Sequence, residues 1–355
     1  MKKSKISGAT IPYQLRPRKA IERNIFVDLL KRLSSYNKID FQKYRYVGFG
    51  AAYLEDFKQM HLELGIITMD CIEMDENAYT RQIFNNPYYF VNSYNASSTE
   101  YIDCDIKYDK NQIIWLDFTS PGLLRQQLSD IEMLCSKLGE LDIIKFTFNS
   151  NFASFISSHH IKNTEVEFNN LTEYPLCSVT DLKNILRFLK DDPTLNIYLP
   201  EEIDQRDLMQ FDKVIRAMAV RAIKRGLKQS VSHLNFQHLT AFTYADGQKM
   251  TTISGIISSD DEFNAILSQN KIREWPFYNN GEGSSEFMNA IKIAVPDMTV
   301  AERIEIDKKI PSQEIEKIAE GLNFFYGGDL KEHVELIKGY HTFYKYLPYF
   351  SKVIY

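Results

Sequence analysis

Two short motifs have the residue types and the spacing that a binding site needs. Gly48-Phe49-Gly50 ends a short apolar run and leads into a helical pattern, so a ligand can approach the backbone there and meet free N–H groups. Glu73-Met74 ends the next apolar run, 23 residues after Gly50, and a carboxylate at that point can accept hydrogen bonds from two hydroxyls. Each motif also has a purely structural explanation, a tight turn or a solvent-facing acid. Together they favour a ligand that contains a nucleoside.

A third candidate is Asp117, near the end of the almost wholly apolar run 112–118. A carboxylate at the tip of a buried strand can orient a nucleophile, act as a base or hold a metal. Thr119 and Ser120 follow it and equally fit the N-cap of the next helix. The sequence leaves these two interpretations of the segment open.

The elements that must position these residues alternate along the chain. Apolar runs bounded by glycine and polar residues predict strands, and the patterns between them have helical spacing. Such alternation predicts parallel βαβ units in a doubly wound α/β sheet. Asp246-Gly247 between two further strand patterns predicts an antiparallel hairpin, and residues 260–355 read as mainly helical. The predicted strands are 44–49, 66–74, 88–93, 112–118 and 142–148, and the predicted helices include 51–64, 76–84, 123–138 and 207–226.

Composition excludes several classes of protein. The chain has 355 residues, of which 44% are apolar and 25% charged, as in a soluble globular protein and unlike a disordered or fibrous one. Four widely spaced cysteines and the absence of a signal segment or a long apolar stretch favour a cytoplasmic protein with free thiols. Neither a P-loop motif nor a zinc-hydrolase motif is present, and no metal site is expected.

Charge is distributed unevenly. Net charge is −5, but residues 1–45 carry twelve Lys and Arg against three acids, so the rest of the chain sums to −14. This basic end is either a solvated helix face or a contact for a nucleic acid or protein partner. The chain also ends in an aromatic cluster, which either packs the last helix or contacts a partner. It consists of Tyr340, Phe343, Tyr344, Tyr346, Tyr349, Phe350 and Tyr355. Whether the protein forms oligomers stays open.

The order of these parts resembles the class I S-adenosylmethionine-dependent methyltransferases over residues 44–258. The motifs are Gly48-Phe49-Gly50 after the first strand, Glu73 after the second and Asp117 at the fourth, followed by the late hairpin. The runs YRYVGFGAAYLEDF, LGI and IEMD are similar to the bacterial group described as "Putative O-methyltransferase". The resemblance implies a Rossmann-like, mostly parallel doubly wound α/β sheet that ends in an antiparallel hairpin.

The resemblance also implies a cofactor, S-adenosylmethionine. Its methionine part would lie against the loop 48–50, its ribose on Glu73 beside Met74, and its adenine near Asn92, Ser93 or Asn95. The implied activity is methyl transfer to an unidentified acceptor, with a hydroxyl favoured. In that reaction Asp117 would act as base or orienter, with Tyr244 nearby on the hairpin.

Departures from the family pattern narrow this expectation. Tyr46 stands where an acid is usual, Ala52 replaces a third glycine, and Asp117-Phe118-Thr119 is unlike the motif of enzymes that methylate amino groups of DNA bases. No cysteine follows a proline, as cytosine-C5 chemistry requires, and the dehydrogenase pattern GxGxxG fails at Tyr53. The main alternative is a catalytically silent methyltransferase-like fold that binds a nucleotide or a partner.

The expected organisation is a basic helical extension (1–40), the sheet domain (41–258, with an insertion at 150–205) and a helical extension (259–355).

Overall fold

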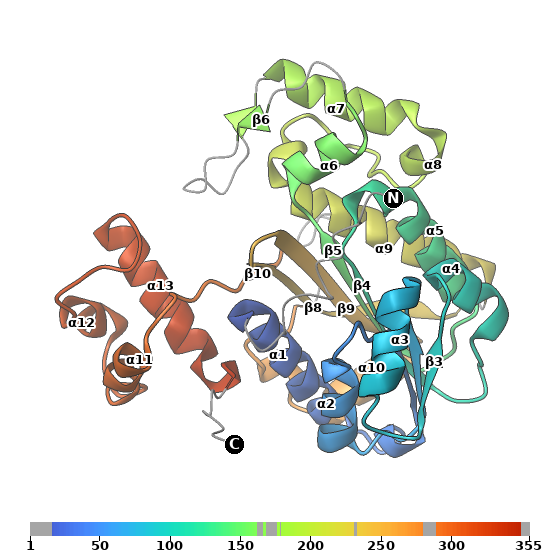
Figure 1. Cartoon of the computed structure of the whole chain (residues 1–355), viewed down its shortest axis with the longest axis horizontal. Coiled ribbons are helices and arrows are strands. Elements are labelled where there is room, and N and C mark those ends of the chain that lie inside the picture. Colours follow the sequence, from blue (N-terminus) through green and yellow to red (C-terminus); the bar gives the residue numbers. More distant parts are fainter. Residues whose placement is uncertain are drawn as a thin grey trace.

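The computed structural model describes residues 16–161, 166–167, 176–177, 179–230, 233–279 and 289–348. Its centre is an eight-stranded sheet in the order β10-β8-β9-β5-β4-β1-β2-β3 (Figure 1). Paired strands of this sheet are parallel, except that β9 runs antiparallel to both β5 and β8. The strands are β1 (Arg45–Phe49), β2 (Met69–Ile72), β3 (Val91–Tyr94), β4 (Gln112–Phe118), β5 (Ile143–Asn149), β8 (Asn235–Ala245), β9 (Lys249–Ser258) and β10 (Ile291–Lys292), and β6 (Val166–Glu167) pairs separately with β7 (Leu176–Cys177).

The predicted fold class is confirmed: five parallel strands are followed by a hairpin, β8–β9, that turns at Asp246-Gly247. Gly247 has φ +96°, a left-handed conformation that glycine adopts without strain. The eighth strand, β10, was not predicted, because a two-residue strand shows no periodicity. It pairs with β8 inside a segment that was expected to be mainly helical.

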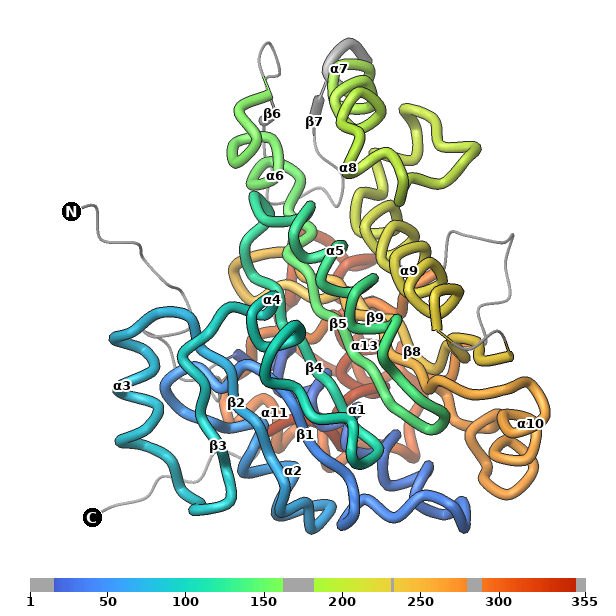
Figure 2. The backbone as a smooth tube through the Cα atoms, turned by 90° about the vertical axis from the view of Figure 1, so that its right-hand side faces the viewer, coloured from blue at the N-terminus to red at the C-terminus, as the bar shows by residue number. Residues whose placement is uncertain are grey.

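Helices cover both faces of the sheet (Figures 1 and 2). Residues of α1, α2, α10 and α13 pack into the core on one face, and residues of α5 and α9 pack into the core on the other. Strand β4 contributes Ile113 and Trp115 to the first core and Ile114 and Leu116 to the second, as expected for a strand buried on both faces. The helices are α1 (Pro17–Leu33), α2 (Glu55–Leu64), α3 (Glu76–Asn85), α4 (Ser98–Glu100), α5 (Leu124–Cys135), α6 (Phe152–Ser158), α7 (Val179–Asp191), α8 (Pro193–Asn196), α9 (Phe211–Gln229), α10 (Asp260–Gln269), α11 (Val300–Asp307), α12 (Ile315–Glu320) and α13 (Leu330–Phe343).

The segment 150–205 contains α6, α7 and α8 and continues from the carboxyl end of β5. Figure 2 shows these helices beyond the end of that strand, at the top of the molecule. The boundaries of the three expected regions stay a prediction. Helices of both terminal regions nevertheless share one core with the sheet, because Ile21 of α1 and Tyr340 of α13 belong to the same cluster as Trp115.

The aromatic residues near the carboxyl end pack the last helix. Tyr340 and Phe343 are buried, and the Phe343 ring stacks on Phe277 with 5.6 Å between centroids. The Tyr346 hydroxyl donates a hydrogen bond to Asp28 at 2.7 Å. The packing interpretation is therefore confirmed for these residues, while Tyr349, Phe350 and Tyr355 lie outside the described residues.

The basic helix α1 is not a solvated face. Eleven of its 17 residues are buried, among them Lys19, Glu22 and Arg23. Eight basic residues between positions 18 and 45 have carboxylate partners within the chain, so their charge is largely matched internally. The pairs are Arg18–Asp246, Lys19–Asp117, Arg23–Asp56, Lys31–Glu63, Arg32–Asp28, Lys38–Glu262, Lys43–Asp40 and Arg45–Asp70.

Candidate active site

The predicted motifs meet at the edge of the sheet where the parallel strands end, here called the carboxyl edge. Gly48 of β1 is paired with Trp115 of β4, so Gly50 and Asp117, each two residues further on, lie at this edge on adjacent strands. Phe49 is paired with Ile72 of β2, and Glu73 follows directly. Ligands of open α/β sheets bind at this edge, and the structure brings all three predicted motifs to it.

The loop after β1 has an unusual backbone. Ala51 and Leu54 have φ +44° and +50°, a left-handed conformation that is costly for residues with a side chain. A Cβ at Gly50 would lie 2.2 Å from the Cys71 sulfur, so packing alone requires glycine there. The steric explanation of this glycine is therefore confirmed, and its contact with a ligand stays a prediction. Strain that the surrounding fold maintains is typical of functional loops.

Glu73 is oriented by its own turn. Its Oε1 accepts a hydrogen bond from the N–H of Asp75 at 3.0 Å, and the Asp75 carboxylate caps α3 through the N–H of Ala78 at 2.8 Å. Burial raises the pKa of Glu73, while the hydrogen bond from Asp75 opposes that shift. Met74 is 64% exposed and offers apolar surface beside the carboxylate. A fixed acid next to an apolar surface fits a ribose and its base.

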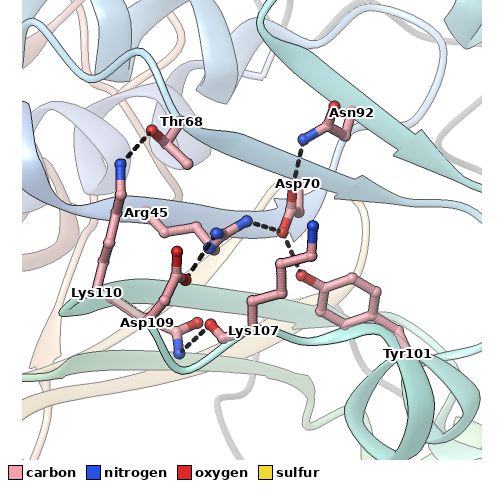
Figure 3. A network of polar contacts seen from close by, with 9 residues as sticks. Arg45, Thr68, Asp70, Asn92, Tyr101, Lys107, Asp109 and Lys110 are labelled. Carbon is pink, nitrogen blue, oxygen red and sulfur yellow. Dashed lines mark hydrogen bonds and ion pairs between the residues drawn. The ribbon is translucent and has the colours of Figure 1, made fainter.

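The three residues predicted near an adenine already have partners within the protein, and Asn95 donates to the carbonyl of Glu73 at 2.9 Å. The side-chain amide of Asn92 donates to Asp70 at 2.9 Å (Figure 3), and Ser93 accepts from Gln82 at 3.4 Å. Asp70 also accepts from Arg45, the first residue of β1, so this network lies toward the opposite edge of the sheet. The structure therefore does not bring Asn92 to the carboxyl edge, and a cofactor role for Ser93 stays a prediction.

Asp117 is the most unusual polar group at the carboxyl edge. Its side chain is 10% exposed, and Oδ2 forms an ion pair with the ammonium of Lys19, which is 5% exposed. The other oxygen, Oδ1, is buried and has no hydrogen-bond partner among the described residues. Buried carboxylate oxygens are normally satisfied, so an orphaned one at a ligand-binding edge indicates a missing donor.

Tyr244 was expected beside Asp117, but the structure separates them. Tyr244 lies on β8, and β9 and β5 stand between that strand and β4. Three strand spacings correspond to roughly 14 Å between the backbones. Position along the chain could not predict this separation, because it depends on the order in which the strands assemble.

The contribution of α1 to this site was missed. Lys19 reaches Asp117 from this helix, and Asp246 of the hairpin turn accepts a hydrogen bond from the backbone N–H of Lys19 at 2.8 Å. The only available signal was the high basic content of the segment, which does not reveal which lysine is buried.

A hollow of about 530 Å³ lies between the turn after β4, the end of β5, helix α6 and the hairpin turn. Its lining carries hydroxyl and amide groups without a charged side chain. It consists of Pro121, Asn149, Ala153, Ser154, Ser157, Ser158 and Gln248.

The strand order and the late hairpin define a Rossmann-like α/β protein, with the three motifs at the carboxyl edge of its sheet. The chain belongs to the family described as "Putative O-methyltransferase", whose model matches residues 11–355.

Two solved structures match the chain over much of its length. Trm1 from Pyrococcus horikoshii, in complex with S-adenosyl-L-methionine, is 13% identical with a TM-score of 0.41, over 94% of this chain and 78% of that one. The N-methyltransferase NodS from Bradyrhizobium japonicum WM9 is 7% identical with a TM-score of 0.34, over 67% of this chain and 96% of that one. No curated protein matches the sequence. In the part of the chain that the structure describes, no helix is both long and apolar enough to cross a membrane.

Proposed function

We propose that the protein transfers a methyl group from S-adenosylmethionine to a hydroxyl group of an acceptor molecule. The observation that carries this proposal is the buried, unsatisfied Oδ1 of Asp117 at the carboxyl edge, on the strand next to the glycine loop. Family membership supports the reaction class. The uncharged polar hollow beside the edge supports an acceptor that carries hydroxyl or amide groups.

The residues at the edge fit the proposed cofactor. Glu73 would accept hydrogen bonds from the ribose hydroxyls, and Met74 would contact the adenine. The loop from Gly48 to Gly50 would lie against the methionine part. When bound, the cofactor supplies an electrophilic methyl group on a positively charged sulfur.

Asp117 would orient the acceptor. Its Oδ1 can accept a hydrogen bond from the acceptor hydroxyl, directing the oxygen lone pair toward the methyl group. As the new C–O bond forms and the S–C bond breaks, the hydroxyl proton passes to Asp117 or to water, and the sulfur becomes a neutral thioether. Positioning of this kind supplies much of the rate enhancement in a transfer to a bound nucleophile.

Replacing Glu73 with alanine should weaken binding of S-adenosylhomocysteine by about 1–3 kcal/mol, because the ribose would lose a charged hydrogen-bond acceptor. Isothermal titration calorimetry of the wild-type protein and the variant measures this effect. Glu76→Ala is the matched control, since this exposed acid begins α3 three residues further on. Equal affinity of wild type and Glu73→Ala would remove Glu73 from the site.

Transfer is tested with methyl-labelled S-adenosylmethionine and pools of small molecules, RNA and protein. Label in an alkali-stable, oxygen-linked product supports the proposal. Cofactor binding without transfer to any pool would favour the catalytically silent alternative. If neither S-adenosylmethionine nor S-adenosylhomocysteine binds at millimolar concentration, the proposed activity is excluded.

A further inference from the structure

We propose that Lys19 is a positioning residue that neutralises Asp117 and thereby sets the charge that faces the reacting sulfur. This inference rests on the proposed function and assigns a role to α1, which lies outside the glycine and acid motifs of the sheet. Lys19 would hold one carboxylate oxygen and leave the other, Oδ1, directed toward the ligand.

The ion pair is largely shielded from water. Only 5% of the Lys19 side chain and 10% of the Asp117 side chain are exposed, so solvent screens their attraction weakly. Lys19 binds Oδ2, and Oδ1 is buried without a hydrogen-bond partner among the described residues. Lys19 therefore occupies one oxygen of Asp117 and leaves the other as an acceptor at the carboxyl edge.

The backbone of Lys19 is fixed independently of its side chain. Arg16, the residue before α1, provides no side-chain cap, and Asp246 of the hairpin turn takes that place. Its Oδ2 accepts the N–H of Lys19 at 2.8 Å, while Arg18 donates to Oδ1 at 3.4 Å and to the carbonyl of Val295 at 2.7 Å. The first turn of α1 is therefore held at the hairpin turn, which places Lys19 over the end of β4.

Two other buried ion pairs of α1 serve as a contrast. Glu22 pairs with Lys145 in the middle of β5, and Arg23 pairs with Asp56 near the start of α2. Of these three pairs, only Lys19–Asp117 involves a residue at the carboxyl end of a central strand. Its position distinguishes it from the other two pairs, which attach α1 to β5 and to α2.

The charge of this pair has a measurable consequence for ligand choice. S-adenosylmethionine carries a positive sulfur, whereas the sulfur of S-adenosylhomocysteine is neutral, and the two are otherwise nearly identical. With Lys19 and Asp117 both present, the pair adds no net charge near that sulfur. Removal of Lys19 leaves the negative charge of Asp117, which favours binding of S-adenosylmethionine. Removal of the Asp117 charge leaves the positive charge of Lys19, which disfavours it.

The test is a double-mutant cycle read by calorimetry with both ligands. The ratio of the two Kd values should shift about tenfold toward S-adenosylmethionine in Lys19→Met and about tenfold away from it in Asp117→Asn. The double variant should return within about twofold of the wild-type ratio, because it is again neutral. Lys31→Met is the matched control, since Lys31 lies on the same helix in an ion pair that is about half exposed. Its ratio should equal that of the wild type.

Each outcome decides the inference. An unchanged ratio of the two Kd values in folded Lys19→Met would overturn the inference about Lys19. The proposal that the protein binds S-adenosylmethionine would still stand. If Lys19→Met does not fold, Asp117→Asn and the double variant decide. A wild-type ratio in Asp117→Asn, or a double variant whose ratio stays as far shifted as that of Asp117→Asn, would overturn the inference as well. If the wild-type protein binds neither ligand, the proposed function fails and the inference fails with it.

Discussion

Replacing Lys145 with methionine is expected to lower the free energy of unfolding by about 3–5 kcal/mol, because it leaves a buried carboxylate without its counter-charge. Lys145 lies on β5 and is 1% exposed. Its ammonium binds Glu22 of α1 at 2.7 Å and lies 3.4 Å from the ring centroid of Trp115. Glu22 is itself 2% exposed, and its other oxygen accepts from Thr252 at 3.3 Å.

Urea denaturation of the wild type and three variants measures this effect. Lys31→Met removes an ion pair of the same helix that is about half exposed, and should cost about 0–1 kcal/mol. The double variant Glu22→Gln with Lys145→Met should recover part of the lost stability, since neither buried charge remains. A loss below about 1 kcal/mol in Lys145→Met would mean that the pair does not attach α1 to the sheet.

Because of Lys145, the free energy of unfolding is also expected to depend on pH. Burial lowers the pKa of Lys145 from 10.5 to about 8, although Glu22 opposes the shift. As the pH rises, the folded protein therefore loses the Lys145 proton at a lower pH than the unfolded chain does. Below pH 8 Lys145 is charged in both states, and the free-energy cost of burying that charge is fully present. Stability contributed by Lys145 should rise as the pH increases from about 8 to about 10.5. The difference in unfolding free energy between wild type and Lys145→Met, followed from pH 7 to pH 10, should grow accordingly; a constant difference would contradict the assignment.

The sequence predicted those elements whose burial pattern is local. Strand β4 was predicted with its observed bounds, because a nearly continuous apolar run that reaches Asp117 is the pattern of a strand covered on both faces. The loop from Gly48 and the acid Glu73 were placed correctly at the carboxyl edge for the same reason, since each directly follows such a run. Strand β10 has two residues and offers no comparable pattern.

What the sequence could not reveal depends on strand register and on partners far along the chain. Asn92 and Ser93 are adjacent, but the Asn92 side chain bonds Asp70 of β2, which the register of β2 and β3 places opposite it, whereas Ser93 bonds Gln82 of α3. The charges of α1 resemble those of a solvated helix. Lys19 finds its carboxylate 98 positions further on, and local periodicity carries no signal for such a pair.

Replacing Asp70 with alanine is the other change for which a loss of about 3–5 kcal/mol is expected, because it leaves the buried guanidinium of Arg45 without its main counter-charge. Asp70 is fully buried on β2 and accepts three hydrogen bonds (Figure 3). Arg45 donates at 2.7 Å, the Tyr101 hydroxyl at 2.7 Å and the Asn92 amide at 2.9 Å. One carboxylate thus joins β1, β3 and the turn after α4.

Asp109 provides a control on the same guanidinium. It accepts from Arg45 at 2.9 Å, but its side chain is 56% exposed, so Asp109→Ala should cost only about 0–1 kcal/mol. Thermal and urea denaturation of both variants measure the difference, and similar losses in the two would contradict the argument from burial. Because this network lies toward the edge opposite the proposed cofactor site, folded Asp70→Ala should bind S-adenosylhomocysteine with nearly wild-type affinity at low temperature. A large loss of affinity would instead mean that the two edges of the sheet are coupled.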